Sequence, residues 1–304
     1  MPSLSGSRPA DLDRYWQTTL DELRSLPPAP EVEELALRST EFATSYVVRL
    51  TSIGPYRIFA YLSIPRGNGP FPARYYVARY GSVVEPIPQG AANALRQHYV
   101  TFSIGVRGQR GADQPFAASF PGLLTQDIDD ASAYIFRGIV ADCCRGLQYL
   151  ISRPEVDGQR VVAIGNDLAL ITAALCPEVT QVVCTPALFC TTSDLVPRTQ
   201  AYPLEEINDY IRSYPSRREE VNLTLAYFDL RWLAAPVRAS TLLIGGADGE
   251  LLDREALDPL LQAIGKTVEF RETEHSSYKD GLFTEKWVTQ QLGLGQPVLP
   301  EHWQ

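Results

Sequence analysis

The residues from 160 to 175 constrain the fold of this chain more than any other stretch. A β-branched apolar run ends at Gly165, and an apolar segment of good helix formers begins a few residues later. This pattern is typical of a strand that turns sharply into a helix. Asp167 occupies the tip of the turn, between Gly165 and Ala169, whose small side chains would let strand and helix approach closely. In such a turn we expect the tip residue to have a strained backbone.

Strand and helix patterns alternate along the rest of the chain. Residues 46–50 and 56–64 show the alternation that is typical of antiparallel strands. Later strand-like runs are separated by segments of helical spacing, as in a parallel sheet with crossover helices. We therefore expect one α/β domain over residues 1–304, with a mostly parallel sheet, antiparallel N-terminal edge strands, helices on both faces and an N-terminal helical arm at 9–26. A further helix is expected at 91–98.

The composition narrows the classes of partner. The chain has 304 residues, of which 45% are hydrophobic and 21% charged, and its net charge is −9. Nucleic acids and anionic membranes need a basic face, so we expect neither as a partner and instead expect a small-molecule substrate. No apolar run reaches the length of about 18 residues that a membrane span needs, and we expect a cytoplasmic protein. No His or Cys cluster has ligand spacing and no glycine-rich phosphate motif occurs, so we expect no metal and no cofactor.

Four side chains that can donate, accept or transfer protons follow predicted strands: Tyr80, Asp167, Asp248 and His275. In an open α/β sheet, reactive groups gather beyond the carboxyl ends of the strands. The order of the last three, tip residue then acid then histidine, is that of the catalytic triad of α/β-hydrolases. His275 is the histidine placed for general base work, since His98 lies in a predicted helix and His302 in the C-terminal tail.

Each member of this predicted triad also has a structural interpretation. Asp248 lies between glycines and could simply form a turn. Asp167 could cap the helix that follows it, because aspartate is favoured at that position. His275 could be a polar residue on a surface loop. The sequence alone leaves these alternatives open.

Several motifs resemble the acetyl xylan esterase and cephalosporin C deacetylase family of α/β-hydrolases over roughly residues 10 to 295. The segments that carry the resemblance are Val106-Arg107-Gly108-Gln109, Phe136 to Asp142, Ser152 to Asp157 and Leu225 to Asp229. The resemblance implies an α/β-hydrolase fold and an activity that removes acetyl groups from small sugars and related esters. It also implies a homo-oligomer, commonly a hexamer.

The resemblance assigns further site residues. By position, Asp167, Asp248 and His275 correspond to the catalytic triad. The oxyanion-hole and substrate-binding residues that it implies are Tyr80, the backbone amide of Leu168, and Arg107 and Gln109 of the Arg-Gly-Gln motif, which helps to hold the active-site loops in place.

The chain departs from the family at the elbow, which is the tight turn at residues 165–170 where the family has its nucleophile. Where the family has Gly-Gly-Ser-Gln-Gly-Gly, residues 165–170 read Gly-Asn-Asp-Leu-Ala-Leu. A serine alkoxide forms an acyl-ester with its substrate, whereas a carboxylate would form a mixed anhydride and is a weak nucleophile toward esters. Serine-type deacetylation is therefore not expected of Asp167.

Three interpretations of Asp167 follow. It could attack saturated carbon, as in hydrolases of the dehalogenase and epoxide hydrolase type, or it could act as an acid or base with water attacking directly. Alternatively, the protein could be a non-catalytic binding protein of the same fold, in which case Asp167→Ser could restore some esterase activity. An Asp167 that points into a pocket within reach of His275 would favour an enzyme, and one that is turned away would favour binding.

Overall fold

A computed structural model describes residues 7–84, 87, 96–112, 114, 116–297 and 299. The helix expected at 91–98 lies mostly outside these residues. The strands are β1 (Glu31–Glu34), β2 (Ala43–Ser52), β3 (Tyr56–Pro65), β4 (Phe71–Tyr76), β5 (Val100–Gly105), β6 (Val156–Gly165), β7 (Gln181–Cys184), β8 (Ser240–Gly245) and β9 (Val268–Glu272). The α-helices are α1 (Leu12–Ser25), α2 (Ile135–Ile151), α3 (Asp167–Leu175), α4 (Thr192–Leu195), α5 (Glu205–Ser213), α6 (Arg218–Ala226), α7 (Leu230–Leu233), α8 (Arg254–Ile264) and α9 (Ser277–Gln291).

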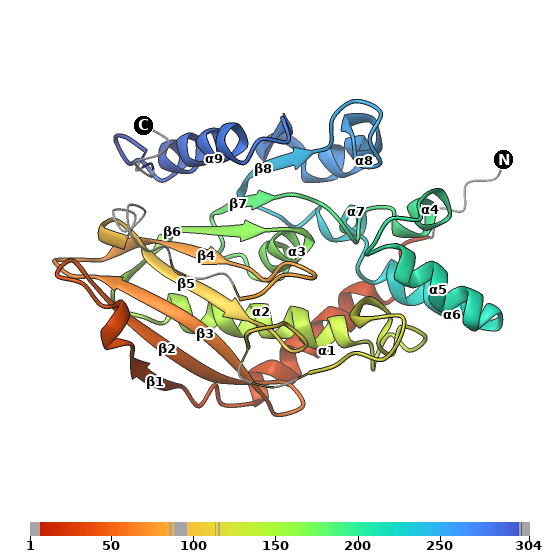
Figure 1. The fold of residues 1–304 in the computed structure, drawn as a ribbon, viewed down its shortest axis with the longest axis horizontal. Coiled ribbons are helices and arrows are strands. Elements are labelled where there is room, and N and C mark those ends of the chain that lie inside the picture. Colours follow the sequence, from red (N-terminus) through yellow and green to blue (C-terminus); the bar gives the residue numbers. More distant parts are fainter. Residues whose placement is uncertain are drawn as a thin grey trace.

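The strands form one twisted sheet in the order β1-β2-β3-β5-β4-β6-β7-β8-β9 (Figure 1). The pairs from β1 to β5 along this order are antiparallel, and every pair from β5 to β9 is parallel. The predicted α/β architecture, a mostly parallel sheet with antiparallel N-terminal strands, is confirmed. Because β6 lies near the middle of the parallel part, the turn after it is at the centre of the edge where polar groups are expected to gather.

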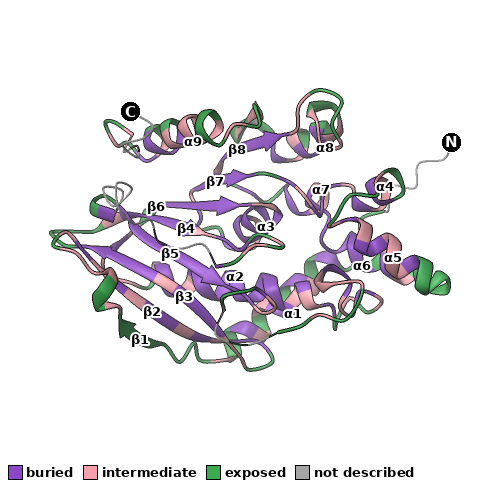
Figure 2. Cartoon of the chain, in the orientation of Figure 1, coloured by how far each residue is buried: buried purple, intermediate pink, exposed green. Residues whose placement is uncertain are grey.

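Alternate residues of β6 face different halves of the core. Val161 and Ala163 belong to the larger apolar cluster, which includes buried residues of α1, α2 and α3. Val162 and Ile164 belong to a smaller cluster with Trp287 of α9 on the opposite face. This period-two pattern of a strand that is buried on both sides explains the unbroken apolar run in the sequence. Figure 2 shows that the inner strands are buried along most of their length, whereas the two edge strands are not: β1 is exposed, and β9 is partly exposed throughout.

The N-terminal arm is a helix that packs on the core. In α1, Leu12, Trp16 and Leu23 are buried at helical spacing. The Trp16 Nε1 donates a hydrogen bond of 2.9 Å to the Tyr227 carbonyl, which follows α6. The arm therefore joins two distant parts of the chain. In the described part of the chain, no helix combines the length and the apolar character needed to cross a bilayer.

Candidate functional site

The turn between β6 and α3 is tight but not strained at its tip. A side chain at Gly165 would place its Cβ 3.1 Å from the Val77 carbonyl oxygen, which explains the glycine. Asp167 is the first residue of α3. Among the described residues, the non-glycine positions with positive φ are Ala29, Asp127, Thr191 and His275. The expectation of a strained tip was therefore wrong, because Asp167 has already entered the helix and adopts negative φ.

The carboxylate of Asp167 is buried and bound to backbone amides of the loop after β7. It accepts hydrogen bonds from the amides of Ala187 (3.0 Å), Leu188 (3.1 Å) and Phe189 (2.9 Å). The residue is 1% exposed. Its position at the N-terminus of α3 adds favourable interaction with the helix dipole. The side chain thus joins α3 to a loop about twenty residues later in the chain, and it is neither a cap of its own helix nor an open reactive group.

Burial also changes the pKa of Asp167. Removal from water raises the pKa of the carboxyl above its ordinary value, and the amides of Phe189, Leu188 and Ala187 act in the opposite direction. A charge at this site is therefore costly unless the three amides remain in place. The charged form of Asp167 thus depends on the amides of the 187–189 loop, and the position of that loop depends on the carboxylate that accepts their hydrogen bonds.

His275 and Asp248 lie on exposed loops at the same edge of the sheet. The Nε2 atom of His275 is 2.7 Å from Glu250 Oε1, and the two side chains are 62% and 44% exposed. His275 has a φ of 51°, a left-handed conformation that histidine adopts more readily than most residues. Asp248 lies in the turn before Gly249 and is exposed. Glu250, which was not predicted from the sequence, is thus the partner of His275 in the structure.

The three residues of the predicted triad are not joined to one another in the structure. Within the described residues, no hydrogen bond or ion pair connects Asp167, Asp248 and His275. The catalytic role of these residues stays a prediction from position and family resemblance.

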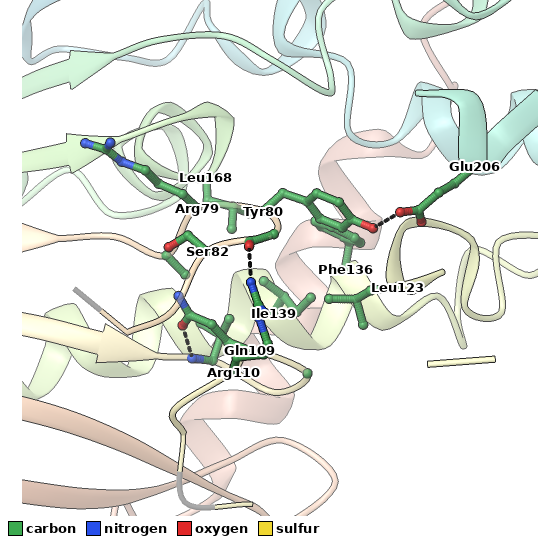
Figure 3. Close-up of a pocket in the computed structure, with 14 residues that line it drawn as sticks. Arg79, Tyr80, Ser82, Gln109, Arg110, Leu123, Phe136, Ile139, Leu168 and Glu206 are labelled. Carbon is green, nitrogen blue, oxygen red and sulfur yellow. Dashed lines mark hydrogen bonds between the residues drawn. The ribbon is translucent and has the colours of Figure 1, made fainter. Parts of the chain in front are cut away.

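A cavity of about 290 Å³ lies beside the elbow (Figure 3). It brings together three of the predicted binding residues, Tyr80, Leu168 and Gln109. Leu168 lies in the first turn of α3, where backbone amides have no partner within the helix. The remaining lining residues are Ala78, Arg79, Gly81, Ser82, Val106, Gly108, Arg110, Leu123, Phe136, Ile139 and Glu206. Asp167, Asp248, His275 and Arg107 do not line the described walls of this cavity.

Glu206 is the acidic residue of the cavity, and it was not predicted from the sequence. The Tyr80 hydroxyl donates a hydrogen bond to Glu206 Oε1. The amide of Leu124, in the 3₁₀ turn Leu123–Thr125, donates to Glu206 Oε2 at 3.1 Å and lies 3.3 Å from the Tyr80 hydroxyl. A side chain at Gly122 would collide with the Glu206 carboxylate, which explains the glycine in this loop. Nothing in the local sequence separates Glu206 from Glu205, and only the fold shows which of them faces the cavity.

The two neighbouring glutamates are expected to affect stability with opposite dependence on pH. Burial raises the pKa of Glu206 above its ordinary value of 4.5, although the bonds from Tyr80 and Leu124 oppose this. Hydrogen bonds from Arg212 and Asn208 hold the pKa of Glu205 below 4.5. As the pH rises past 4.5, Glu206 loses its proton later in the folded chain than in an unfolded chain, so this group makes the free energy of unfolding fall as the pH rises through that range. For Glu205 the unfolded chain takes up the proton first, so the contribution of Glu205 to the free energy of unfolding falls as the pH drops below 4.5.

Urea unfolding between about pH 3 and pH 7 measures these contributions. The difference in free energy of unfolding between the unmodified chain and Glu206→Gln should decrease as the pH rises above 4.5. The same difference for Glu205→Gln should increase with pH below 4.5. If the difference in free energy of unfolding changed with pH by the same slope for both variants, the assignment of Glu206 to a buried site would be contradicted.

The Arg-Gly-Gln motif at 107–109 holds the loop after β5. Arg107 donates from Nε (2.9 Å) and Nη2 (2.7 Å) to the two carboxylate oxygens of Asp142 in α2, and its amide donates to the same carboxylate at 3.0 Å. Gln109 Oε1 accepts a hydrogen bond of 3.2 Å from the Val106 amide. These contacts fix the wall of the cavity to α2, and Gln109 also lines the cavity itself.

In the part of the chain that the structure describes, no group of three or more His, Cys, Asp or Glu side chains is arranged to hold a metal ion. The lining residues with polar side chains are Tyr80, Ser82, Arg79, Gln109, Arg110 and Glu206. These side chains and the backbone amides of the wall are the groups that a ligand in the cavity would meet.

The sheet order, the tight turn from β6 to α3 and helices on both faces define an α/β-hydrolase fold. A sequence profile of the acetyl xylan esterase (AXE1) family matches residues 4–252, which is most of the chain. The chain belongs to this family of hydrolases. The matched range includes Asp167 and Asp248, and His275 lies beyond it.

Individual relatives agree with this assignment. Acetyl esterase Axe7A of Xylanibacter ruminicola is 27% identical over 235 residues, which are 73% of this chain and 52% of that protein. This chain thus spans about half the length of that relative. The crystal structure of acetyl xylan esterase 1 from Thermoanaerobacterium sp. JW/SL YS485 has a TM-score of 0.83 at 23% identity, covering 94% of this chain and 96% of that one. The acetyl xylan esterase from Paenibacillus sp. R4 has a TM-score of 0.81 at 21% identity, covering 95% and 96%.

Proposed function

We propose that this protein binds a small acetylated sugar in the cavity beside the elbow and does not hydrolyse it through residue 167. The observation that carries the proposal is the position of Asp167, whose carboxylate is 1% exposed and accepts hydrogen bonds from three backbone amides. A nucleophile must reach the reacting carbon, and a general base must be within about 3 Å of the proton it removes. A carboxylate that is occupied in this way does neither.

The cavity supports the binding part of the proposal. Its walls are mostly apolar, with a few polar groups that converge from different segments, as is usual for small-molecule sites. The choice of an acetylated sugar rests on the relatives, which are named acetyl esterase and acetyl xylan esterase. A ligand of this kind combines an acyl group, which suits the apolar wall, with hydroxyl groups, which suit the polar end.

Turnover assays test the proposal. We expect the rates with nitrophenyl acetate, acetylated xylose, a styrene-type epoxide and an alkyl halide to equal those of a His275→Ala variant. The epoxide and the halide are included because an aspartate nucleophile acts on saturated carbon. A rate that exceeds this control and is lost in Asp167→Asn would refute the proposal in favour of a hydrolase.

Asp167→Ser is expected to gain no esterase activity. A serine at this position starts from the same helical backbone, and its side chain would be directed at the amides of the 187–189 loop. The expected result is a nitrophenyl acetate rate no higher than that of the unmodified chain, together with lower stability. Recovery of esterase activity would mean that the elbow can adopt the strained conformation of an active enzyme.

Three further assignments are part of the proposal. The acidic composition and the lack of a long apolar run support a cytoplasmic location, and the family resemblance supports a homo-oligomer, with a hexamer as the expected form. The assignment of Asp248 and His275 to the site by family resemblance also stays a proposal, without Asp167 as a nucleophile. Light scattering coupled to gel filtration measures the oligomeric state directly.

A further inference from the structure

The carboxylate of Glu206 has bonding capacity that the protein does not use. A carboxylate offers about four lone-pair positions on its two oxygens. One oxygen accepts from the Tyr80 hydroxyl and the other from the Leu124 amide. The side chain is 7% exposed and lines the cavity, so its remaining lone pairs are accessible mainly from the cavity side. A buried acceptor of this kind favours a ligand that supplies a donor.

The charges around the cavity favour a neutral donor. In the described residues, Glu206 forms no ion pair with Lys or Arg, but Arg79 and Arg110 are among the residues that line the same cavity. Arg110 donates to the Gly81 carbonyl at 3.2 Å, and Arg79 points away from the Tyr80–Glu206 pair (Figure 3). A cationic ligand would be repelled by the guanidinium of Arg110, which is held at Gly81 in the cavity wall. A hydroxyl group meets no such cost, and the Tyr80 hydroxyl already shows that this carboxylate accepts from one.

The opposite wall suits the uncharged carbon part of such a ligand. Leu123, Phe136, Ile139 and Leu168 line the cavity next to the polar pair. The Tyr80 ring stacks on Phe136, with ring centroids 6.2 Å apart, so the hydroxyl of Tyr80 is held at the polar end. A ligand with one free hydroxyl and an apolar acyl group could place each group against a matching wall.

We propose that Glu206 selects the ligand by accepting a hydrogen bond from one of its free hydroxyl groups. This inference rests on the proposed function and adds the residue that determines specificity. It implies that the cavity discriminates against a ligand in which that hydroxyl is missing, because the buried carboxylate would then face the ligand without a donor.

Calorimetric titration with a monoacetylated methyl xyloside and its monodeoxy analogues tests the inference. In each analogue, one free hydroxyl is replaced by hydrogen, so that every analogue still fits the cavity. We expect one analogue to bind at least about tenfold more weakly than the parent, as a lost hydrogen bond to a charged group requires. The quantity to compare is the ratio of the dissociation constant of that analogue to the dissociation constant of the parent. In Glu206→Met this ratio should fall close to one, and in Glu206→Gln, which keeps a carbonyl acceptor, it should be intermediate.

Two matched variants separate recognition from a merely structural role. Glu205→Gln changes the same charge on the same helix, but Glu205 binds Arg212 and Asn208 outside the cavity, so the ratio should not change. Tyr80→Phe removes the hydroxyl that holds Glu206 and should preserve the ratio. If Glu206→Met instead weakens the parent and all analogues by the same factor, as is expected only of Tyr80→Phe, Glu206 only positions Tyr80 and the inference is overturned.

The outcomes also separate the inference from the proposed function. Equal binding of the parent and every analogue to the unmodified chain overturns the inference alone. Binding of none of these compounds overturns the proposed function and the inference with it.

Discussion

Asp167→Ala is expected to lower the free energy of unfolding by about 3 kcal/mol or more, because the amides of Ala187, Leu188 and Phe189 would be left without acceptors in a buried site. Each unsatisfied amide costs about 1 to 3 kcal/mol, and water has little access to a position that is 1% exposed. Urea unfolding measures the change. Asp167→Asn, which keeps one acceptor oxygen but adds a competing donor, should lose less than the alanine variant.

The control for this experiment is Asp258→Ala. Asp258 lies on the exposed face of α8, so its replacement should change the free energy of unfolding by no more than about 0.5 kcal/mol. If Asp167→Ala is as mild as the control, the carboxylate does not hold the loop, and the structural interpretation of Asp167 is wrong.

Asp142→Ala is expected to cost about 3 to 5 kcal/mol, since it removes one partner of a buried ion pair and leaves the other uncompensated. The Asp142 side chain is fully buried and that of Arg107 is 15% exposed. In α2, Gly138 leaves room for the Arg107 side chain, because a side chain at Gly138 would place its Cβ 2.4 Å from Arg107 Nη1. The same change should loosen the wall that carries Gln109, so ligand affinity should fall together with stability.

Asp21→Ala provides the matched comparison. Asp21 pairs with Arg24 on α1 at 2.7 Å, but both side chains are 56% exposed, so the expected loss is less than about 1 kcal/mol. Equal losses for the Asp21 and Asp142 variants would show that burial does not strengthen the Arg107 pair.

The fold could be predicted from the sequence because its signals are local. The β-branched run of β6, the turn at Gly165 and the helix formers of α3 are contiguous, and so are the alternating residues of β2 and β3. Their hydrophobic periodicity depends only on which faces are buried. The mostly parallel sheet follows in turn from the alternation of strands and helices.

The site could be predicted only in part, because its contacts join residues that are far apart in the chain. Tyr80, Leu168 and Gln109 were identified as binding residues, and the structure brings them to one cavity. Glu206 lies 126 residues from its partner Tyr80, and no local pattern indicates that pairing. Without coordinates, the acidic start of α5 is indistinguishable from an ordinary helix N-terminus.

The direction in which the Asp167 side chain points could not be predicted from the sequence either. Asp167 at a tight turn is compatible with a nucleophile, a helix cap or a brace for another loop. The choice depends on whether the amides of residues 187–189 point toward it. His275 likewise lies beside Glu250, two residues beyond the acid that the spacing indicated. One or two residues in a loop change which carboxylate reaches the histidine.

Proton NMR of the protein with a monoacetylated methyl xyloside tests the central claim most directly, because one sample reports both binding and release of acetate. We predict saturation transfer from the protein to the ligand, with free acetate appearing no faster than in buffer. Acetate release above the buffer rate that is lost in Asp167→Asn would contradict the account, since it would make Asp167 a catalytic group rather than the residue that holds the 187–189 loop.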